Sequence, residues 1–335
     1  MVAMLVATSY FGNRILRHVR MDVRKLRNEG FDIVVHTFSE NDLRFYRKSV
    51  RDIVEVTKET GMRVWIDPWG IGGVFGGEAF SDAALHHREW LQVAANGDKL
   101  PACCPSNPGF QGFIHEWTDA ALETGADAVF WDEPHFYSDE TERIGCYCKY
   151  CQDLAERGEP AIGSFLREVC GKVKSRGSQN VVCLLPSSLE RKDTLDWNEI
   201  AGLESVMNLG STPFWGMQGA DPEKYVDLIG RELMGLASRA RVQTHLWIQG
   251  FRIPAGREEE IRRSAIAAGQ LGIDVIAIWG FDACESMSFL SCERPQMAWA
   301  AFLKAIAQLR DRHGRSPSTT VREEKTSTGD RLGDN

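Results

Sequence analysis

The chain has 335 residues, of which 43% are hydrophobic and 26% charged, and its formal net charge is −8 at pH 7. This acidic balance disfavours nucleic acids and anionic membranes as partners, and the length is enough for one large core. No apolar run approaches the roughly 20 residues that cross a bilayer, and residues 1–7 are too short for the core of a signal peptide, so we expect a cytoplasmic protein.

Eight short runs rich in β-branched and aromatic residues recur along the chain. Each is almost fully apolar, as strands buried on both faces of a parallel sheet require. In chain order they cover residues 2–8, 32–37, 63–67, 128–132, 180–185, 205–209, 242–248 and 274–279. Apolar residues at spacings of three and four lie between these runs and predict helices that separate the strands.

Glycines mark the predicted helix ends. Gly30, Gly61, Gly125 and Gly272 each precede a strand, where glycine tolerates the left-handed conformation that ends a helix. Eight such units within residues 1–313 predict a single (β/α)8 TIM barrel, because an open doubly wound sheet usually has fewer strands and a glycine-rich nucleotide loop after the first. The remaining residues 314–335 are polar and lack aromatic side chains, so we expect a disordered tail.

Two of the predicted strand-to-helix loops are long. The loop after the third strand covers about residues 70–120 and includes a glycine-rich start, a predicted helix near residues 82–93 and the pair Cys103–Cys104. The loop after the fourth strand covers about residues 133–159 and holds three more cysteines. Both loops leave the C-terminal ends of strands, so we expect them to lie over the mouth of the barrel.

Cys146, Cys148 and Cys151 are spaced too closely for ordinary disulfides. Nine cysteines without a recognisable secretory signal favour reduced thiols over a disulfide framework. Zinc prefers four thiolates in a tetrahedron, so these three cysteines and either Cys103 or Cys104 predict a structural zinc site that joins the two long loops. An iron–sulfur cluster is the alternative for the same donors and would indicate a redox barrel.

Aromatic and acidic side chains dominate the C-terminal ends of the predicted strands, where a TIM barrel has its active site. Aromatic faces beside carboxylates suit a sugar ring, and no run of Lys or Arg is present there to clamp a phosphate. A small carbohydrate is therefore the expected substrate. The candidate catalytic residues are Asp67, Asp132, Glu133, Asp282 and Glu285, and the candidate substrate-binding residues are Tyr10, His36, Trp69, His135, Trp215, Gln249 and Trp279.

Residues 100–170 resemble the family 42 glycoside hydrolases, which are β-galactosidases. The resemblance rests on the sequence FWDE at 130–133, the Cys-x-Cys-x-x-Cys cluster at 146–151 and the aliphatic and aromatic helix pattern at 162–168. It implies that Glu133 is the general acid/base at the end of the fourth strand. It also implies a zinc ion held by one upstream cysteine and the cluster, here Cys103, Cys146, Cys148 and Cys151.

The chain departs from the pattern of this family at two positions. Asp132 stands where the family has Asn, and a carboxylate can only accept a hydrogen bond from a sugar hydroxyl. Gln249 stands where the resemblance implies a nucleophilic Glu, and an amide cannot attack the anomeric carbon as a carboxylate does. A second catalytic carboxyl group is therefore expected among Asp67, Asp282 and Glu285. Asp67 is favoured because a tryptophan follows it closely at the same strand end.

The leading hypothesis is a glycoside hydrolase that acts on a small oligosaccharide or glycoside, with Glu133 as proton donor. The second catalytic group is one of the other carboxylates, or a group of the substrate that Asp132 or Gln249 orients. Two other classes stay open: a carbohydrate-binding barrel without activity, and a metal-containing TIM-barrel enzyme of another class. A homo-oligomer is compatible with all three.

Overall fold

The computed structural model describes residues 4–137, 145–159, 161–186 and 205–314. Eight parallel strands close into a barrel in the order β1-β10-β9-β8-β7-β6-β3-β2, which confirms the predicted TIM barrel. The barrel strands are β1 (Leu5–Tyr10), β2 (Ile33–Thr37), β3 (Arg63–Asp67), β6 (Ala128–Trp131), β7 (Gln179–Leu184), β8 (Val206–Ser211), β9 (Gln243–Gln249) and β10 (Val275–Trp279). The predicted tail from residue 315 onward lies outside the described residues.

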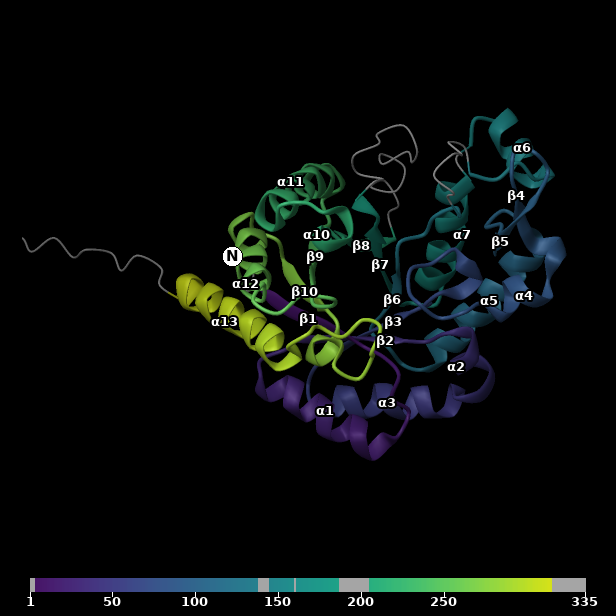
Figure 1. Cartoon of the computed structure of the whole chain (residues 1–335). Helices are drawn as coiled ribbons and strands as arrows, with labels where there is room; N and C mark the ends of the chain where they lie inside the picture. Colours follow the sequence, from purple (N-terminus) through teal and green to yellow (C-terminus); the bar gives the residue numbers. More distant parts are fainter. Residues whose placement is uncertain (1–3, 138–144, 160, 187–204, 315–335) are drawn as a thin grey trace, which may run out of the picture.

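Helices surround the barrel (Figure 1). The long ones are α1 (Leu16–Asn28), α3 (Arg47–Glu59), α5 (Pro108–Glu123), α7 (Ala161–Ser175), α11 (Pro222–Ala240), α12 (Glu259–Gln270) and α13 (Pro295–Gly314). Short helices lie in the loops: α2 (Glu40–Phe45), α4 (Asp82–His86), α6 (Lys149–Glu156) and α10 (Trp215–Gln218), with 3-10 turns at Ile71–Gly73, Arg88–Trp90 and Phe281–Cys284. None of the described helices is long and apolar enough to cross a membrane.

Glycines lie at the ends of helices, as predicted. Gly30, Gly61, Gly125 and Gly272 have φ between 77° and 91°, and each lies between the end of a helix and the next strand. A side chain with a Cβ is disfavoured in this conformation, so glycine lets each helix end and the chain turn back toward the barrel.

Alternate strand residues fill the barrel interior, while the others pack against the helices. The interior layer includes Val35, Trp65, Phe130 and Trp247, with the rings of Trp65 and Phe130 stacked at a centroid distance of 6.0 Å. Truncating a ring as deeply buried as Phe130 to Ala would cost about 3–5 kcal/mol. Side chains alternate between the two faces of each strand, so the strand-end residues on the same face as this layer point toward the mouth of the barrel.

The third loop contains a hairpin that the sequence pattern did not predict. The helix predicted near residues 82–93 is α4 alone, which ends at His86, and the following run forms strand β4 (Leu91–Val93). β4 pairs antiparallel with β5 (Lys99–Cys103) around a turn in which Gly97 has a φ of 89°. The hairpin lies beside α6, away from the barrel axis (Figure 1).

A buried carboxylate fixes the glycine-rich start of this loop. Glu40, on α2, accepts hydrogen bonds from the Gly72 N–H at 2.9 Å, the Ser81 hydroxyl at 2.6 Å and the Ala83 N–H at 2.7 Å. Further along, the Gly76 N–H donates to the carbonyl of Asp132 at 3.0 Å. These bonds hold the loop against the end of β6, where the candidate catalytic residues begin.

Candidate functional site

A cavity of about 320 Å³ opens at the mouth of the barrel. Three carboxyl groups line it together with aromatic rings, one hydroxyl and one cation. The lining residues are Gly77, Glu78, Asp132, Glu133, Thr212, Phe214, Met217, Trp247, Phe251, Arg252, Trp279, Phe289 and Leu290. The expected combination of acids and aromatic side chains therefore lies at the C-terminal ends of the strands.

Asp132 and Glu133 both reach the cavity although they are neighbours in sequence. Along β6, Ala128 and Phe130 face the interior, so Asp132 continues inward and Glu133 would face the helices in regular strand geometry. Glu133 instead has a φ of 42°, in the left-handed region, while its N–H still donates to the Cys183 carbonyl at 3.0 Å. This local turn brings the second side chain to the same cavity, and such strained backbone is typical of functional sites.

The two carboxyl groups lie close together beneath Gly76. A Cβ atom on Gly76 would lie 2.5 Å from Asp132 Oδ2 and 3.2 Å from Glu133 Oε2, so these oxygens are separated by less than the sum of the two distances. Only a residue without a side chain allows the loop backbone to approach both acids so closely. Gly76 is therefore a direct steric neighbour of the candidate catalytic pair.

Burial and mutual repulsion raise the pKa values of these acids. Loss of solvent raises the pKa of Glu133 to about 7, against the opposing effect of a hydrogen bond from the Thr212 hydroxyl. The pKa of Asp132 is raised well above its usual value by burial first and then by the charges of Asp67, Glu133 and Glu78. A carboxyl group that titrates near neutral pH is suited to proton transfer.

Asp67 ends β3 and lies beneath this pair without lining the cavity. Its side chain is fully buried, and within the described part of the chain neither carboxylate oxygen has a hydrogen-bond partner. Burial, followed by the charge of Glu133, raises its pKa well above the usual range. The sequence favoured Asp67 as the second catalytic acid, whereas the structure places Asp132 nearer to the cavity.

Aromatic rings form the wall that faces the acids. Trp279 ends β10, which lies four strands from β6 around the closed barrel and therefore opposite to it. Its ring contacts Trp247 edge-on at a centroid distance of 5.9 Å, and Phe214 meets Phe251 in the same way at 5.0 Å. Trp69 does not line the cavity; it stacks on Phe11 at 5.7 Å behind it.

Three predicted substrate-binding residues lie outside the cavity, which corrects the sequence interpretation. Tyr10 donates a hydrogen bond to Asp22 of α1 at 2.6 Å, and the His36 ring contacts the Thr57 hydroxyl of α3 at 2.8 Å. Both side chains point outward from their strands, away from the barrel interior, and are buried beneath helices. Trp215 is buried in the outer core, with its Nε1 donating to Glu260 of α12 at 3.1 Å.

Two polar candidates are engaged by the protein itself. The Gln249 side chain accepts from the Gly216 N–H at 2.8 Å and donates to the Phe251 carbonyl at 3.0 Å, so its amide holds two loops together. The His135 Nδ1 lies 2.5 Å from the Glu133 carbonyl, and burial lowers its pKa, so the neutral ring serves as a donor to the backbone. Neither residue lines the cavity.

The two carboxylates after β10 are also outside the cavity. Asp282 forms an ion pair with Lys25 of α1, and Glu285 accepts a hydrogen bond from Gln296 at 2.5 Å on the surface. Asp282 lies in a turn in which Asp282, Ala283 and Cys284 all have positive φ, and Glu285 directly follows it. The structure therefore does not bring these two predicted catalytic residues together with Asp132 and Glu133.

Several lining residues were not among the sequence candidates. The alternation of side chains along a strand could have predicted Trp247 as a lining residue, because it lies two residues before Gln249 on the same strand face. Thr212 directly follows β8, and Arg252 follows β9, where its guanidinium lies 3.7 Å from the centre of the Phe289 ring. Glu78 lies in the third loop, and no periodic signal in the sequence indicates that it reaches the cavity.

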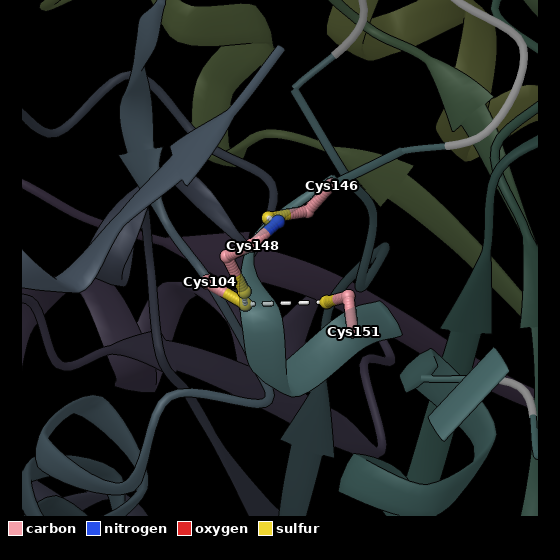
Figure 2. A group of neighbouring side chains, drawn as sticks. All are labelled: Cys104, Cys146, Cys148 and Cys151. Atoms are coloured by element: carbon pink, nitrogen blue, oxygen red, sulfur yellow. Dashed lines mark hydrogen bonds between the residues drawn. The ribbon is translucent and has the colours of Figure 1, made fainter. Parts of the chain in front are cut away.

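Four cysteines form a compact group between the hairpin and the start of α6. Figure 2 shows the sulfurs of Cys104, Cys146, Cys148 and Cys151 pointing toward one another. All four sulfur atoms lie within 4.8 Å of each other, and Cys104 Sγ is 3.5 Å from Cys148 Sγ and 3.4 Å from Cys151 Sγ. Cys146 Sγ also accepts backbone N–H groups of Val93 at 3.3 Å and Cys148 at 3.4 Å. The group could hold a metal ion.

Cys104, and not Cys103, is the upstream member of this group. Successive residues at the end of a strand point in opposite directions, so Cys103 turns into the hydrophobic core beside Gly72 while Cys104 faces the cluster. Burial raises the pKa of the Cys103 thiol to about 12, as expected for an inert core thiol. The assignment of Cys103 as a metal ligand is thereby corrected.

No protein-family model matches the chain, and no curated protein matches it either. Solved structures with a similar fold include an endo-β-1,4-mannanase from Thermotoga petrophila, with 12% identity and a TM-score of 0.58, covering 94% of this chain and 78% of that one. An endo-1,4-β-mannanase from Rhizomucor miehei has 10% identity and a TM-score of 0.61, covering 91% and 95%. A GH18 chitinase from Pseudoalteromonas aurantia has 12% identity and a TM-score of 0.52, covering 91% and 99%. At these identities the comparisons establish the TIM-barrel fold.

Proposed function

We propose that this protein is a glycoside hydrolase that acts on a small glycoside, with Glu133 as the proton donor. The observation that supports it most is the position of Glu133 in an aromatic-lined cavity, where burial raises the pKa of its carboxyl group to about 7. A substantial fraction of this group is protonated at neutral pH. The solved structures of mannanases and a chitinase with the same fold agree with this class of reaction, as does the sequence resemblance to family 42.

The cavity supplies the groups that glycosidic bond cleavage needs. Trp247 and Trp279 offer apolar faces to a sugar ring, and Asp132 and Glu78 offer acceptors for its hydroxyls. Glu133 protonates the leaving oxygen as the bond from that oxygen to the anomeric carbon breaks, and the water that replaces the leaving group gives its proton to a second carboxylate of the cavity, Asp132 or Glu78. The Thr212 hydroxyl donates to one Glu133 oxygen and leaves the other for the substrate.

The proposal is tested with Glu133→Gln, which keeps the size and the Thr212 contact but cannot donate the proton. A panel of 4-nitrophenyl glycosides first identifies a substrate. We expect kcat on that substrate to fall by about 10²–10⁴-fold in the variant. Glu285→Gln, an exposed carboxylate away from the cavity, is the matched control and keeps full activity. Equal turnover by wild type and Glu133→Gln would remove Glu133 from the mechanism.

A carbohydrate-binding barrel without activity is the second candidate. It is favoured by the seventh barrel strand, where Gln249 is occupied by backbone partners and supplies no carboxylate. Calorimetric binding of a sugar together with no product from any glycoside of the panel would select this function over the hydrolase.

We further propose that the four-cysteine group binds a single structural zinc ion. Zn–S bonds of about 2.3 Å place the sulfurs of a tetrahedral site about 3.8 Å apart, close to the separations of 3.4 and 3.5 Å seen here. A cluster of several irons would need its thiolates spread more widely. All nine cysteines are free, in keeping with a reducing compartment such as the cytoplasm. Elemental analysis that finds one zinc per chain in colourless protein would support the site, and brown protein containing iron would contradict it.

A further inference from the structure

Two glycines fix the backbone of the loop after β3 immediately before Glu78. The Gly76 N–H donates to the Asp132 carbonyl at 3.0 Å, which ties the loop to the end of β6. Gly77 has a φ of 111° and packs so closely on the Trp69 indole that a Cβ atom there would lie 1.7 Å from Trp69 Cδ1. Residues with a side chain do not fit at either position, so the path of the chain into Glu78 is set by contact with the site itself.

The Glu78 side chain lies between the two sides of the cavity that it lines. Besides burial, its negative charge raises the pKa values of Glu133 and Asp132, which follow β6. The Arg252 guanidinium, which follows β9 across the barrel, acts against burial to lower the pKa of Glu78. The charge of Glu78 also adds to the effect of burial on the pKa of Cys284, in the turn after β10. One carboxyl group is therefore within electrostatic reach of both walls.

Asp132 and Glu133 are not separated in this way. They are neighbours after one strand, and both approach the position of a Cβ on Gly76, with Asp132 Oδ2 at 2.5 Å and Glu133 Oε2 at 3.2 Å. They therefore meet a bound sugar from the same side. In hydrolysis with two carboxyl groups, the proton donor and the second group act on opposite faces of the sugar. Among the described residues that line the cavity, the remaining carboxylate is Glu78.

The surroundings of Glu78 favour its ionised form more than those of Glu133. Atoms around the Glu78 carboxyl group displace part of its solvent and raise its pKa, but its own backbone N–H, the Trp69 indole and the Arg252 cation oppose this rise. The Trp69 Nε1–H lies close to the carboxyl group without the geometry of a normal hydrogen bond. Two acids whose surroundings separate their proton affinities can divide into a proton donor and a base. Glu78 is also exposed at the rim, where water reaches it directly.

We infer that Glu78 is the second catalytic carboxylate and that it acts as the general base of an inverting hydrolysis. This inference rests on the proposed hydrolase function. Glu133 gives its proton to the leaving oxygen while the bond from C1 to that oxygen breaks. Glu78 takes a proton from a water molecule whose oxygen forms the new bond to C1 on the opposite face. Glu133 then regains a proton from solvent and Glu78 releases one, so water is the only co-reactant.

Arg252 is a positioning residue for this base. Its backbone has a φ of 50° and its N–H donates to the Leu290 carbonyl at 2.9 Å. Its Nε donates to the Phe289 carbonyl at 3.1 Å, and its guanidinium lies 3.7 Å from the centre of the Phe289 ring. These contacts hold a cation where it keeps Glu78 ionised. Arg252→Gln removes the cation, so the pKa of Glu78 should rise and the low-pH limb of the kcat/KM profile should move to higher pH.

Glu78→Gln tests the base directly, on the glycoside that the substrate panel identifies. We expect its kcat to fall by about 10²–10⁴-fold and its profile to lose the decline of kcat/KM at low pH, while its thermal unfolding stays close to that of wild type. Glu89→Gln is the matched control, because Glu89 is an exposed carboxylate of the same loop outside the cavity. This variant should keep the kcat and the pH profile of wild type.

The configuration of the product gives a second measurement that needs no variant. NMR of the sugar first released by wild type should show an inverted anomeric configuration. In Glu78→Ala, sodium azide should restore turnover, because azide attacks C1 without a base, and the product should be a glycosyl azide of inverted configuration.

The possible results separate this inference from the function on which it rests. Wild-type kcat in a folded Glu78→Gln protein, or a retained configuration of the product, would overturn the role of Glu78 as base. Loss of the low-pH limb in Asp132→Asn instead of Glu78→Gln would overturn it as well. In each case an inactive Glu133→Gln protein would leave the hydrolase function intact. No turnover of any glycoside by wild type would overturn both.

Discussion

Gly76 offers a direct test of the geometry of the acid pair. In Gly76→Ala the new Cβ would lie 2.5 Å from Asp132 Oδ2 and 3.1 Å from its Cγ, far inside ordinary contact. The φ of Gly76 is not in the left-handed region, so alanine fits the backbone and the effect is purely steric. Relief of the clash requires the Asp132 carboxyl group to move by about 1 Å, because carbon–oxygen contacts of this kind normally exceed about 3.4 Å.

This displacement is expected to affect activity much more than stability. Overpacking at a buried site costs about 1–3 kcal/mol, and the low end applies because the contacted atoms are the end of a side chain. A misplacement of about 1 Å in a catalytic group can cost about 10²-fold in rate. We therefore expect kcat/KM on the best glycoside to fall by about 10²-fold while the free energy of unfolding falls by about 1 kcal/mol.

Gly171→Ala is the matched control, because Gly171 lies inside α7 with open space around its Cβ position. This variant should keep full activity and gain about 0.5–1 kcal/mol of stability from helix propensity. Urea unfolding and steady-state kinetics on the three proteins make the comparison. Wild-type kcat/KM in a folded Gly76→Ala protein would refute the placement of the acid pair beneath this loop.

Three further predictions concern the acid and the thiols. Burial raises the pKa of Glu133 from its ordinary 4.5 to about 7, so the free energy of unfolding of wild type falls as pH rises through this interval. Glu133→Gln cannot ionise and does not show this loss. In urea unfolding the variant should therefore be more stable than wild type by about 3 kcal/mol at pH 8 but not at pH 4.5. For the same reason kcat/KM should fall as pH rises above about 7, where the proton donor is lost, and a flat profile up to pH 9 would contradict this role. Cys104→Ser should reduce bound zinc and lower the melting temperature, whereas Cys103→Ser, which changes a core thiol, should retain one metal ion per chain by elemental analysis.

The barrel and the position of Glu133 could be predicted from the sequence because both depend on local patterns. Apolar runs of strand length, helix-period spacing between them and glycines at the helix ends predicted the eight strands within a few residues. The third strand-to-helix loop was harder, because a short apolar run such as Leu91–Val93 fits either a helix or a strand until its pairing partner β5 is known.

The arrangement of the site depends on contacts that no local pattern specifies. Whether a residue at a strand end faces the mouth or the helices depends on the register of the closed sheet. Tyr10 and His36 were predicted to contact the ligand, but their side chains lie on the faces of their strands that pack against helices. Glu78 reaches the acids only through the path of its loop. Cys104 replaces Cys103 because successive side chains at the end of β5 point in opposite directions, and only the packing of the loops decides which of them faces the other cysteines. The sequence by itself therefore determined the strands, the acid pair and the thiol cluster, since these are properties of neighbouring residues. The tertiary structure alone decided which side chains meet, because closure of the barrel brings together residues far apart along the chain.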